Sequence, residues 1–101
     1  GGIIIVHGIG LVIGSGVIIK SKVTLFHQVT IGVRGGDNKD IGFATIEENC
    51  TIYAGAKILG SVTIGKNSII GANVVVTKDI PINSIVTTDT KLLIRERQIK
   101  L

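Results

Sequence analysis

The chain has 101 residues, of which 45% are hydrophobic but only three are aromatic, and it carries one cysteine and a formal net charge of +4. A chain of this length holds one domain with a modest core, and a core of Ile, Val and Leu is typical of β structure. The single cysteine, Cys50, excludes an internal disulfide framework and a cysteine-rich metal site, so we expect it to pack in the core. The small positive charge mildly favours anionic partners without identifying them.

The chain contains no apolar stretch of the roughly 18 residues that a membrane-spanning helix needs. Its apolar start, GGIIIV, lacks the basic segment of a signal peptide, and the one cysteine suits a reducing compartment. We therefore expect a cytoplasmic protein without membrane insertion. Because the pattern described next is already present at a start that lacks Met, we also expect upstream residues to belong to the same domain.

Aliphatic residues recur every six positions along most of the chain. The leading position of each hexad holds Ile13, Ile19, Leu25, Ile31, Ile46, Ile52, Ile58, Ile64, Ile70, Val76 and Ile82. Four residues later comes a smaller residue, such as Val17 or Val23, and residues that favour turns or water fill the positions between. Neither a helix of period 3.6 nor a strand of period two fits this rule.

Short strands joined by sharp corners do fit it. Each hexad then forms one side of a triangular coil, with its leading residue inside, and residues 18 apart stack at the strand spacing of about 4.8 Å. The sequence therefore predicts an all-β parallel β-helix of about four triangular coils over residues 1–86. Spacing alone does not set the handedness of this helix.

Two segments leave the repeat. Residues 33–45, VRGGDNKDIGFAT, separate Ile31 from Ile46, so we expect a protruding surface loop that is a candidate for function. One RGG triplet without interleaved aromatic residues is a weak signal for RNA, and we expect no nucleic-acid partner. Residues 87–101 are expected to form a short C-terminal tail, as a strand or a short helix.

His7 breaks the aliphatic rule. Counting six residues back from Ile13 places this imidazole in the leading position, and the alternative is a terminal coil whose histidine faces water. The nearby Gly8, Gly10 and Gly14 imitate a dinucleotide-binding motif. That motif needs a strand before it and a helix after it, whereas the hexads here continue, so these glycines are interpreted as corners.

The hexads resemble those of the hexapeptide-repeat acyltransferases, and the segment HGIGLVIG, from His7 to Gly14, resembles the serine acetyltransferase branch and related sugar and capsule O-acetyltransferases. The resemblance implies a left-handed parallel β-helix and acetyl-CoA as acyl donor, with no metal. It implies that His7 is the general base. It also implies a homotrimer whose active sites lie between neighbouring prisms.

Two further segments, IYAGAKILG (residues 52–60) and IGANVVVTKDIP (residues 70–81), resemble those that line the acyl-CoA groove of this family. Ala54 and Ala72 share the third position of their hexads and are expected to stack, leaving a shallow slot for the pantetheine arm. The resemblance also matches Gly32 to a glycine beside the thioester, and Gly71 and Lys78 to neighbours of the outer part of the cofactor. At the end of the groove, Thr88 and Thr90 stand where relatives often carry a Gly-x-Pro-Ala turn. The sequence thus predicts these cofactor-binding residues: Gly32, Ala54, Gly71, Ala72 and Lys78.

The segments that would bind the acceptor depart from serine acetyltransferases. Val6 precedes His7 where the family commonly has Asp, and the loop lacks the Arg-His-Pro-like run that binds the carboxylate of serine. Phe43, or Asn38 and Lys39, stand in its place, depending on how the loop is aligned. This favours a sugar or polysaccharide hydroxyl over serine as acceptor.

His27 is a candidate for the missing second histidine. It lies at the third position of the hexad that begins at Leu25, on the side of the prism expected for His7 but one coil above, so the two rings are expected to approach each other. The alternative is a surface histidine that faces water.

We therefore predict an O-acetyltransferase in which His7 takes the acceptor proton, the acceptor oxygen attacks the thioester directly, and backbone N–H groups near Gly32 bind the oxyanion. The alternative is a catalytically inactive or purely structural β-helix. A zinc carbonic anhydrase of the same fold needs three histidines, and this chain has two. A flat ice-binding face needs a continuous threonine array, which the hexads do not form.

Overall fold

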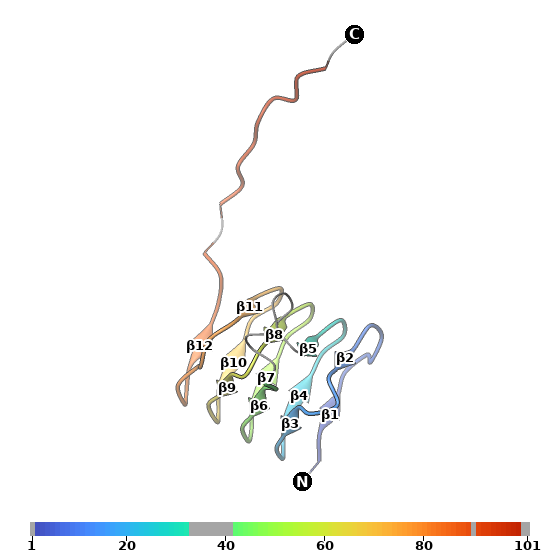
Figure 1. Cartoon of the computed structure of the whole chain (residues 1–101), viewed down its shortest axis with the longest axis vertical. Helices are drawn as coiled ribbons and strands as arrows, with labels where there is room; N and C mark the ends of the chain where they lie inside the picture. Colours follow the sequence, from blue (N-terminus) through green and yellow to red (C-terminus); the bar gives the residue numbers. More distant parts are fainter. Residues whose placement is uncertain (1, 33–41, 90, 100–101) are drawn as a thin grey trace.

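The computed structural model of the chain describes residues 2–32, 42–89 and 91–99. Within these ranges it contains twelve short strands and no helix (Figure 1). The strands are β1 (Ile4–Ile5), β2 (Val12–Ile13), β3 (Ile18–Ile19), β4 (Thr24–Leu25), β5 (Thr30–Gly32), β6 (Thr45–Ile46), β7 (Thr51–Ile52), β8 (Lys57–Leu59), β9 (Thr63–Ile64), β10 (Ile69–Ile70), β11 (Val75–Val76) and β12 (Ile85–Val86).

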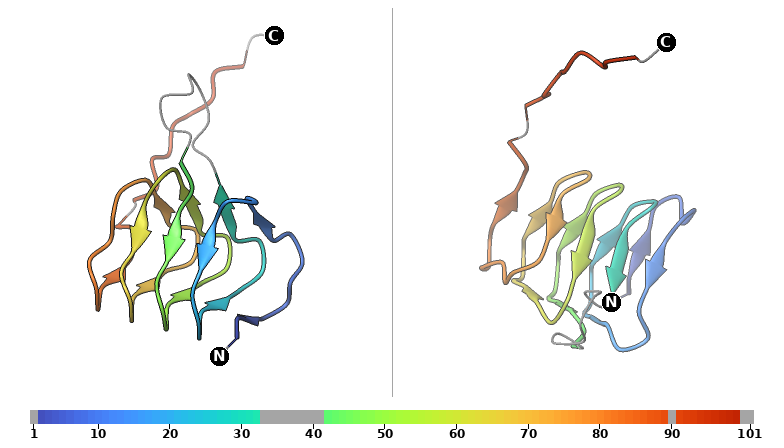
Figure 2. Two further views of the ribbon diagram at one scale, coloured as in Figure 1. Left: turned by 60° about the horizontal axis from the view of Figure 1, so that its bottom comes forward. Right: turned by 45° about the horizontal axis from the view of Figure 1, so that its top comes forward.

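These strands form the three faces of a prism. Every strand pair is parallel, and consecutive strands belong to different faces, as a coil requires (Figure 2). The five-stranded face has the order β1-β4-β7-β10-β12, the four-stranded face β11-β8-β5-β2 and the three-stranded face β3-β6-β9. The parallel β-helix predicted from the hexads is confirmed.

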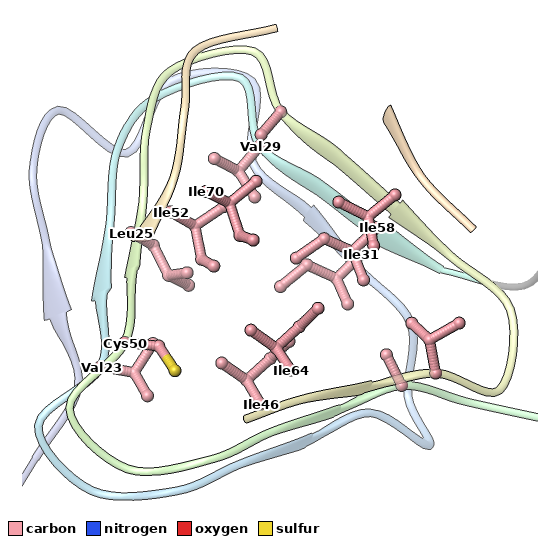
Figure 3. Close-up of a cluster of buried hydrophobic side chains, with 14 of the residues drawn as sticks. Val23, Leu25, Val29, Ile31, Ile46, Cys50, Ile52, Ile58, Ile64 and Ile70 are labelled. Carbon is pink, nitrogen blue, oxygen red and sulfur yellow. The ribbon is translucent and has the colours of Figure 1, made fainter. Parts of the chain in front are cut away.

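The leading residues of the hexads fill the centre of the prism. Viewed along the axis, Leu25 and Ile52 project from one face, Ile31 and Ile58 from the second, and Ile46 from the third (Figure 3). All of these side chains have no exposed surface. The aliphatic residues therefore stack in three inward columns, and their burial is the main stabilising term of the fold.

The corners that follow the five-stranded and three-stranded faces use a left-handed backbone at the fourth position of the hexad. The non-glycine residues with positive φ at this position are Lys22, Gln28, Asn49, Asn67, Asn73 and Asn83. Asparagine adopts this conformation more readily than most residues. At one corner Asn49 donates a hydrogen bond to Asn67 at 2.9 Å, and Asn67 donates one to Asn83 at 3.1 Å, forming a ladder along the axis.

Cys50 lies at the same corner, inside the prism beside Val23 (Figure 3). It has no exposed surface, as expected from the sequence, and its thiol donates a hydrogen bond to the Gly65 carbonyl at 3.2 Å. Burial raises the pKa of the Cys50 thiol. Ser68, one coil further on, is buried as well, but its hydroxyl donates to the Pro81 carbonyl at 3.0 Å and accepts from the Ser84 N–H at 3.1 Å.

The predicted loop re-enters the prism earlier than expected. Residues 33–41 lie outside the described part of the chain, but Ala44 is already fully buried in the core and Thr45 begins β6. The end of the loop therefore includes at most residues 42 and 43. Residues 87–89 and 91–99 of the predicted tail form neither helix nor strand, and they lead away from the prism (Figure 1).

The coil register differs from the prediction at His7. Ile5 pairs with Leu25, so the two inward residues are 20 residues apart instead of 18. His7 is therefore not in the leading position, and the prediction that it replaces an inward aliphatic residue is wrong. The two extra residues are accommodated at the corner after β1, where a local hydrogen bond joins the Ile9 N–H to the His7 carbonyl at 2.8 Å.

The register also differs near the end of the prism. Ile80, not Ile82, pairs with Ile64, and the side chain of Ile82 is 56% exposed. Placing Ile82 in the leading position was therefore wrong. The shorter turn is possible because Gly65 has no side chain, since a Cβ there would collide with the Pro81–Ile82 peptide.

No helix within residues 2–32, 42–89 and 91–99 is long and apolar enough to cross a membrane.

Candidate active site

The third positions of the hexads on the five-stranded face form a column along one edge of the prism. The residue two places after the inward residue of β1, β4, β7, β10 and β12 is in turn His7, His27, Ala54, Ala72 and Thr88. We call this column the histidine edge. It places both histidines and both alanines that the sequence predicted on the same edge of one chain.

The two imidazole rings lie close together at one end of this edge. Their centroids are 6.3 Å apart and their planes meet at 72°. Together with Ile9 and Gln28 they line a pocket of about 360 Å³. The expected approach of the two rings is therefore observed, although it arises from the corner with two extra residues and not from an 18-residue coil.

His7 has an unusual backbone. Its φ is +53°, and it is the only non-glycine residue with positive φ in the described part of the chain that does not occupy the fourth position of a hexad. This conformation costs about 1 kcal/mol or more for a residue with a Cβ. Strained residues of this kind cluster at functional sites. The strain here holds the exposed imidazole at the mouth of the pocket instead of inside the prism.

His27 is more enclosed than His7. Its Nδ1 atom is buried and has no hydrogen-bond partner among the described residues. Its backbone carbonyl accepts a hydrogen bond from the Gly55 N–H at 3.1 Å, which fixes the corner that carries the ring. The ring therefore has one nitrogen, Nε2, with which to bind a ligand in the pocket.

A second pocket lies further along the histidine edge. Its volume is also about 360 Å³, and it is lined by Gly71, Ala72, Asn73, Val74, Thr87 and Thr88. Ala54 and Ala72 are adjacent on the edge, because β7 and β10 pair and the Asn73 N–H donates to the Ala54 carbonyl at 3.0 Å. The structure thus brings together the predicted residues Ala54, Gly71 and Ala72, with Thr87 and Thr88 beside them. Thr90, the other threonine expected at the end of the groove, lies outside the described residues.

Gly32 and Lys78 lie elsewhere. Each follows an inward residue of the four-stranded face, Ile31 and Val76, so both are at the end of that face remote from the histidine edge. We call this the Gly32 edge. Gly32 lies four positions after Gln28 in the chain, a span on the order of 13 Å for an extended strand. Within one chain the structure does not bring these two predicted residues to the histidine pair.

The Gly32 edge has open space beside it. A Cβ added at Gly32 would meet no atom of the described residues within 4 Å, so nothing in this part of the chain keeps a ligand from its backbone. Phe43 lies at the same edge, where its ring covers Gly14 and Gly16 closely enough to touch an added Cβ on either. Phe43 is thus remote from His7 in the same chain, and the alternative loop residues Asn38 and Lys39 lie outside the described residues.

A larger pocket, of about 600 Å³, lies at the third edge of the prism. It is lined by charged residues of both signs, including Glu47, Lys66 and Asp79, and by no histidine. Asp79 is already engaged, because it accepts a hydrogen bond from the Thr63 N–H at 2.9 Å. Size alone therefore does not identify the active site, and the chemistry favours the smaller pocket at the histidine pair. Across the described ranges, no three His, Cys, Asp or Glu side chains are grouped to hold a metal ion.

The sequence did not identify two neighbours of the histidine pair. Ile9 reaches the pocket only because of the two extra residues at its corner, which the hexad rule does not reveal. Gln28 directly follows His27 in the chain, and this position could have identified it as a neighbour of the pocket. The stacked rings of Phe26 and Tyr53, with centroids 4.8 Å apart, were also missed; they immediately precede His27 and Ala54 in the chain.

The fold and the histidine edge define a class of protein, the parallel β-helix transferases built from hexapeptides. Residues 43–78 match the family described as bacterial transferase hexapeptide (six repeats). A serine acetyltransferase of Bacillus pumilus is 46% identical over 80 residues, which cover 79% of this chain and 36% of that protein.

Solved structures agree with this match. Serine acetyltransferase isoform 3 of Entamoeba histolytica, in complex with cysteine, superposes with a TM-score of 0.81 at 35% identity, over 95% of this chain and 34% of that one. The Brucella abortus serine acetyltransferase in complex with coenzyme A gives a TM-score of 0.77 at 33% identity, over 85% and 35% of the two chains.

The chain belongs to the hexapeptide-repeat acyltransferase superfamily, and within it resembles the serine acetyltransferase branch. The predicted left-handed parallel β-helix is thereby confirmed. The chain spans about a third of the length of these relatives.

Proposed function

We propose that this chain is the β-helix of an acetyl-CoA-dependent O-acetyltransferase and that the histidine edge carries its active site. The observation that supports this most directly is the common edge itself. A strained, exposed histidine, a second histidine and a two-alanine slot follow one another along it. A base beside a narrow groove is the arrangement that transfer from a long, thin thioester requires.

In the proposed reaction neutral His7 accepts the proton of the acceptor hydroxyl as its oxygen attacks the thioester carbonyl. Histidine suits this role because it changes charge near neutral pH. The tetrahedral intermediate then collapses, the carbon–sulfur bond breaks, and His7 returns the proton to the departing thiolate, giving coenzyme A as thiol. The reaction needs no metal, and no covalent enzyme intermediate forms.

The donor is proposed to lie along the histidine edge. The coenzyme A complex of the Brucella abortus relative supports this choice of cofactor. Small side chains at Ala54 and Ala72 let the pantetheine arm approach the backbone, and the pocket at Gly71, Thr87 and Thr88 receives the part beyond it. Thr88, in place of the family's usual turn, makes the outer end of this groove more polar.

The site is proposed to be completed by a second copy of the chain. Gly32 and Lys78 match cofactor-binding positions of the family, yet they lie on the Gly32 edge. Gly32 is about 13 Å along the face from the corner at Gln28, and Lys78 is two coils further along the axis. Both edges serve one active site if the Gly32 edge of one prism faces the histidine edge of its neighbour. A homotrimer closes such a ring of contacts.

The proposed acceptor carries a hydroxyl group. Serine is the acceptor that the names of the relatives give. Among the described residues, the pocket at the histidine pair is lined by His7, Ile9, His27 and Gln28 and contains no lysine or arginine to pair with the carboxylate of serine. This chemistry favours an uncharged sugar or polysaccharide hydroxyl. A cytoplasmic location remains a prediction from the sequence.

Calorimetry with acetyl-CoA tests this proposal, followed by thiol release across a panel of serine and sugar acceptors. We expect Ala72→Leu to fill the slot and weaken acetyl-CoA binding at least tenfold. Glu48→Leu is the matched control, because Glu48 occupies the same third position of a hexad at another corner and is exposed. Absence of acetyl-CoA binding in the wild type would favour an inactive scaffold instead.

A further inference from the structure

The order of residues on the histidine edge places His27 between the proposed base and the acyl slot. β4 pairs with β1 on one side and with β7 on the other, so His27 is the direct neighbour of His7 and of Ala54. Successive coils are separated by about 4.8 Å. If the acceptor hydroxyl is at His7 and the pantetheine arm at Ala54, the thioester carbonyl joining them lies at His27.

The carbonyl oxygen needs a hydrogen-bond donor when it becomes an oxyanion. Gly32, the backbone donor expected from the family, lies on the other edge of its own chain and reaches this point only from a neighbour. No lysine or arginine in the described part of the chain lines the pocket at the histidine pair. Of the described side chains in this pocket, His27 and Gln28 can donate a hydrogen bond, and His27 is the one in the column between His7 and Ala54.

The environment of His27 determines which of its ring nitrogens carries the proton. Nδ1 is buried and has no hydrogen-bond partner in the part of the chain that the structure describes, and buried N–H groups without an acceptor are rare in folded proteins. A neutral imidazole carries one proton, on one of its two nitrogens. The neutral ring is therefore expected to carry the proton on Nε2, the nitrogen left to the pocket.

We propose, as an extension of the proposed acetyltransferase function, that His27 is a catalytic residue whose Nε2–H binds the oxyanion. As the acceptor oxygen forms its bond to the carbonyl carbon, the C=O electron pair moves onto oxygen, and that oxygen accepts the hydrogen bond. His7 holds the acceptor proton meanwhile. When the carbon–sulfur bond breaks, the carbonyl re-forms and the proton passes to sulfur, so His27 neither gains nor loses a proton.

Two substitutions separate this role from that of a base. His27→Ala removes the donor, and we expect kcat to fall roughly 100-fold or more, with the KM for acetyl-CoA changed less than about threefold. His27→Gln keeps a neutral N–H donor but cannot accept a proton at neutral pH. We therefore expect it to retain kcat within about tenfold of the wild type.

Equal loss of kcat in His27→Gln and His27→Ala would overturn the proposal, and so would wild-type kcat in His27→Ala. Glu48→Ala is the control for the effect of an alanine substitution on the backbone of a corner, because Glu48 has the equivalent hexad position at another corner. This variant should retain wild-type activity. Nitrogen-15 NMR of the folded protein gives a readout independent of turnover. A proton on Nε2 of His27 is expected, and a proton on Nδ1 in the neutral ring would contradict the proposal.

The same measurements distinguish failure of the inference from failure of the proposed function. If the wild type and His7→Ala differ in thiol release but His27→Ala matches the wild type, only the role of His27 is wrong. If the wild type releases no thiol from acetyl-CoA with any acceptor, the acetyltransferase function itself fails.

Discussion

The imidazole rings of His7 and His27 lie 6.3 Å apart, although the inward residues beneath them, Ile5 and Leu25, are 20 residues apart rather than 18. The two additional residues widen one corner of the first coil. A regular coil would have turned His7 into the core, where an imidazole has no polar partner. The irregular corner instead places both rings at one pocket on the outside of the prism.

The corrected register at the end of the prism predicts different costs for two neighbouring isoleucines. Ile80 packs against the core, whereas Ile82 is 56% exposed. We expect Ile80→Ala to lower the free energy of unfolding by about 1–3 kcal/mol, and Ile82→Ala to change it by less than about 0.5 kcal/mol. Urea unfolding of both variants measures this difference. A larger loss of unfolding free energy in Ile82→Ala than in Ile80→Ala would contradict this register and support the regular hexad spacing.

The asparagine ladder is expected to stabilise the corner opposite the four-stranded face. Asn67 has φ +61°, accepts a hydrogen bond from Asn49 and donates one to Asn83. Asn67→Ala loses both bonds and must adopt a left-handed backbone, so we expect a cost of about 1–3 kcal/mol. Asn67→Gly loses only the bonds and should cost less. Thermal unfolding in which glycine is the more damaging substitution would contradict this account.

Cys50 is expected to make stability fall at alkaline pH. Burial raises the pKa of its thiol above the ordinary value of 9.0, so above that pH the unfolded chain loses a proton that the folded chain retains. The stability that the neutral thiol contributes is therefore complete below about pH 9 and is lost as pH rises through the folded pKa.

Comparison with Cys50→Ala isolates this effect, because the other titrating groups are the same in both proteins. The free energy of unfolding should decline more steeply above pH 9 in the wild type than in the variant. Parallel pH profiles would show that the thiol is not protected by burial. Slow alkylation of native Cys50, relative to the unfolded chain, is the accompanying expectation.

An active site shared between chains predicts complementation. His7→Ala disables the histidine edge, and Gly32→Phe places a ring at the Gly32 edge, where an added Cβ meets no described atom within 4 Å. After the two inactive variants are unfolded together and refolded at equal amounts, one of the three sites in each mixed trimer should combine two intact edges, which is about a quarter of all sites. Thiol release should return to about that fraction of the wild-type rate. Mixtures as inactive as the separate variants would place the whole site within one chain.

Much of the fold followed from the sequence because one strict position governs it. Between Ile13 and Val76 each hexad offers a single aliphatic residue that fits the inward column, so the register is unambiguous. The register was predicted wrongly at the two ends of the prism, where two alternative registers are possible. In the first coil the inward position was assigned to His7 and not to Ile5, and in the last coil to Ile82 and not to Ile80. At these corners local backbone geometry decides, through the turn at His7 and the short Pro81 turn above Gly65.

The site was predicted in part for a reason that proved incorrect. The proximity of His7 and His27 was expected from an 18-residue coil, but the structure achieves it through the third positions of two hexads separated by a longer coil. The stacking of Ala54 and Ala72 followed from their regular spacing. The sequence did not indicate that Gly32 and Lys78 lie on another edge. Resemblance to the cofactor-binding segments of a family does not tell whether two such segments serve the same site from one chain or from two.

The central claim is that His7 is the base of an acetyl transfer carried out at the histidine edge. Its most direct test is the rate of thiol release from acetyl-CoA with the best acceptor of the panel, compared between the wild type and His7→Ala. Both proteins should bind acetyl-CoA with similar affinity and unfold at similar temperatures. We expect the variant to be at least about 100-fold slower. Equal rates in the two proteins would contradict the assignment of His7 as the base.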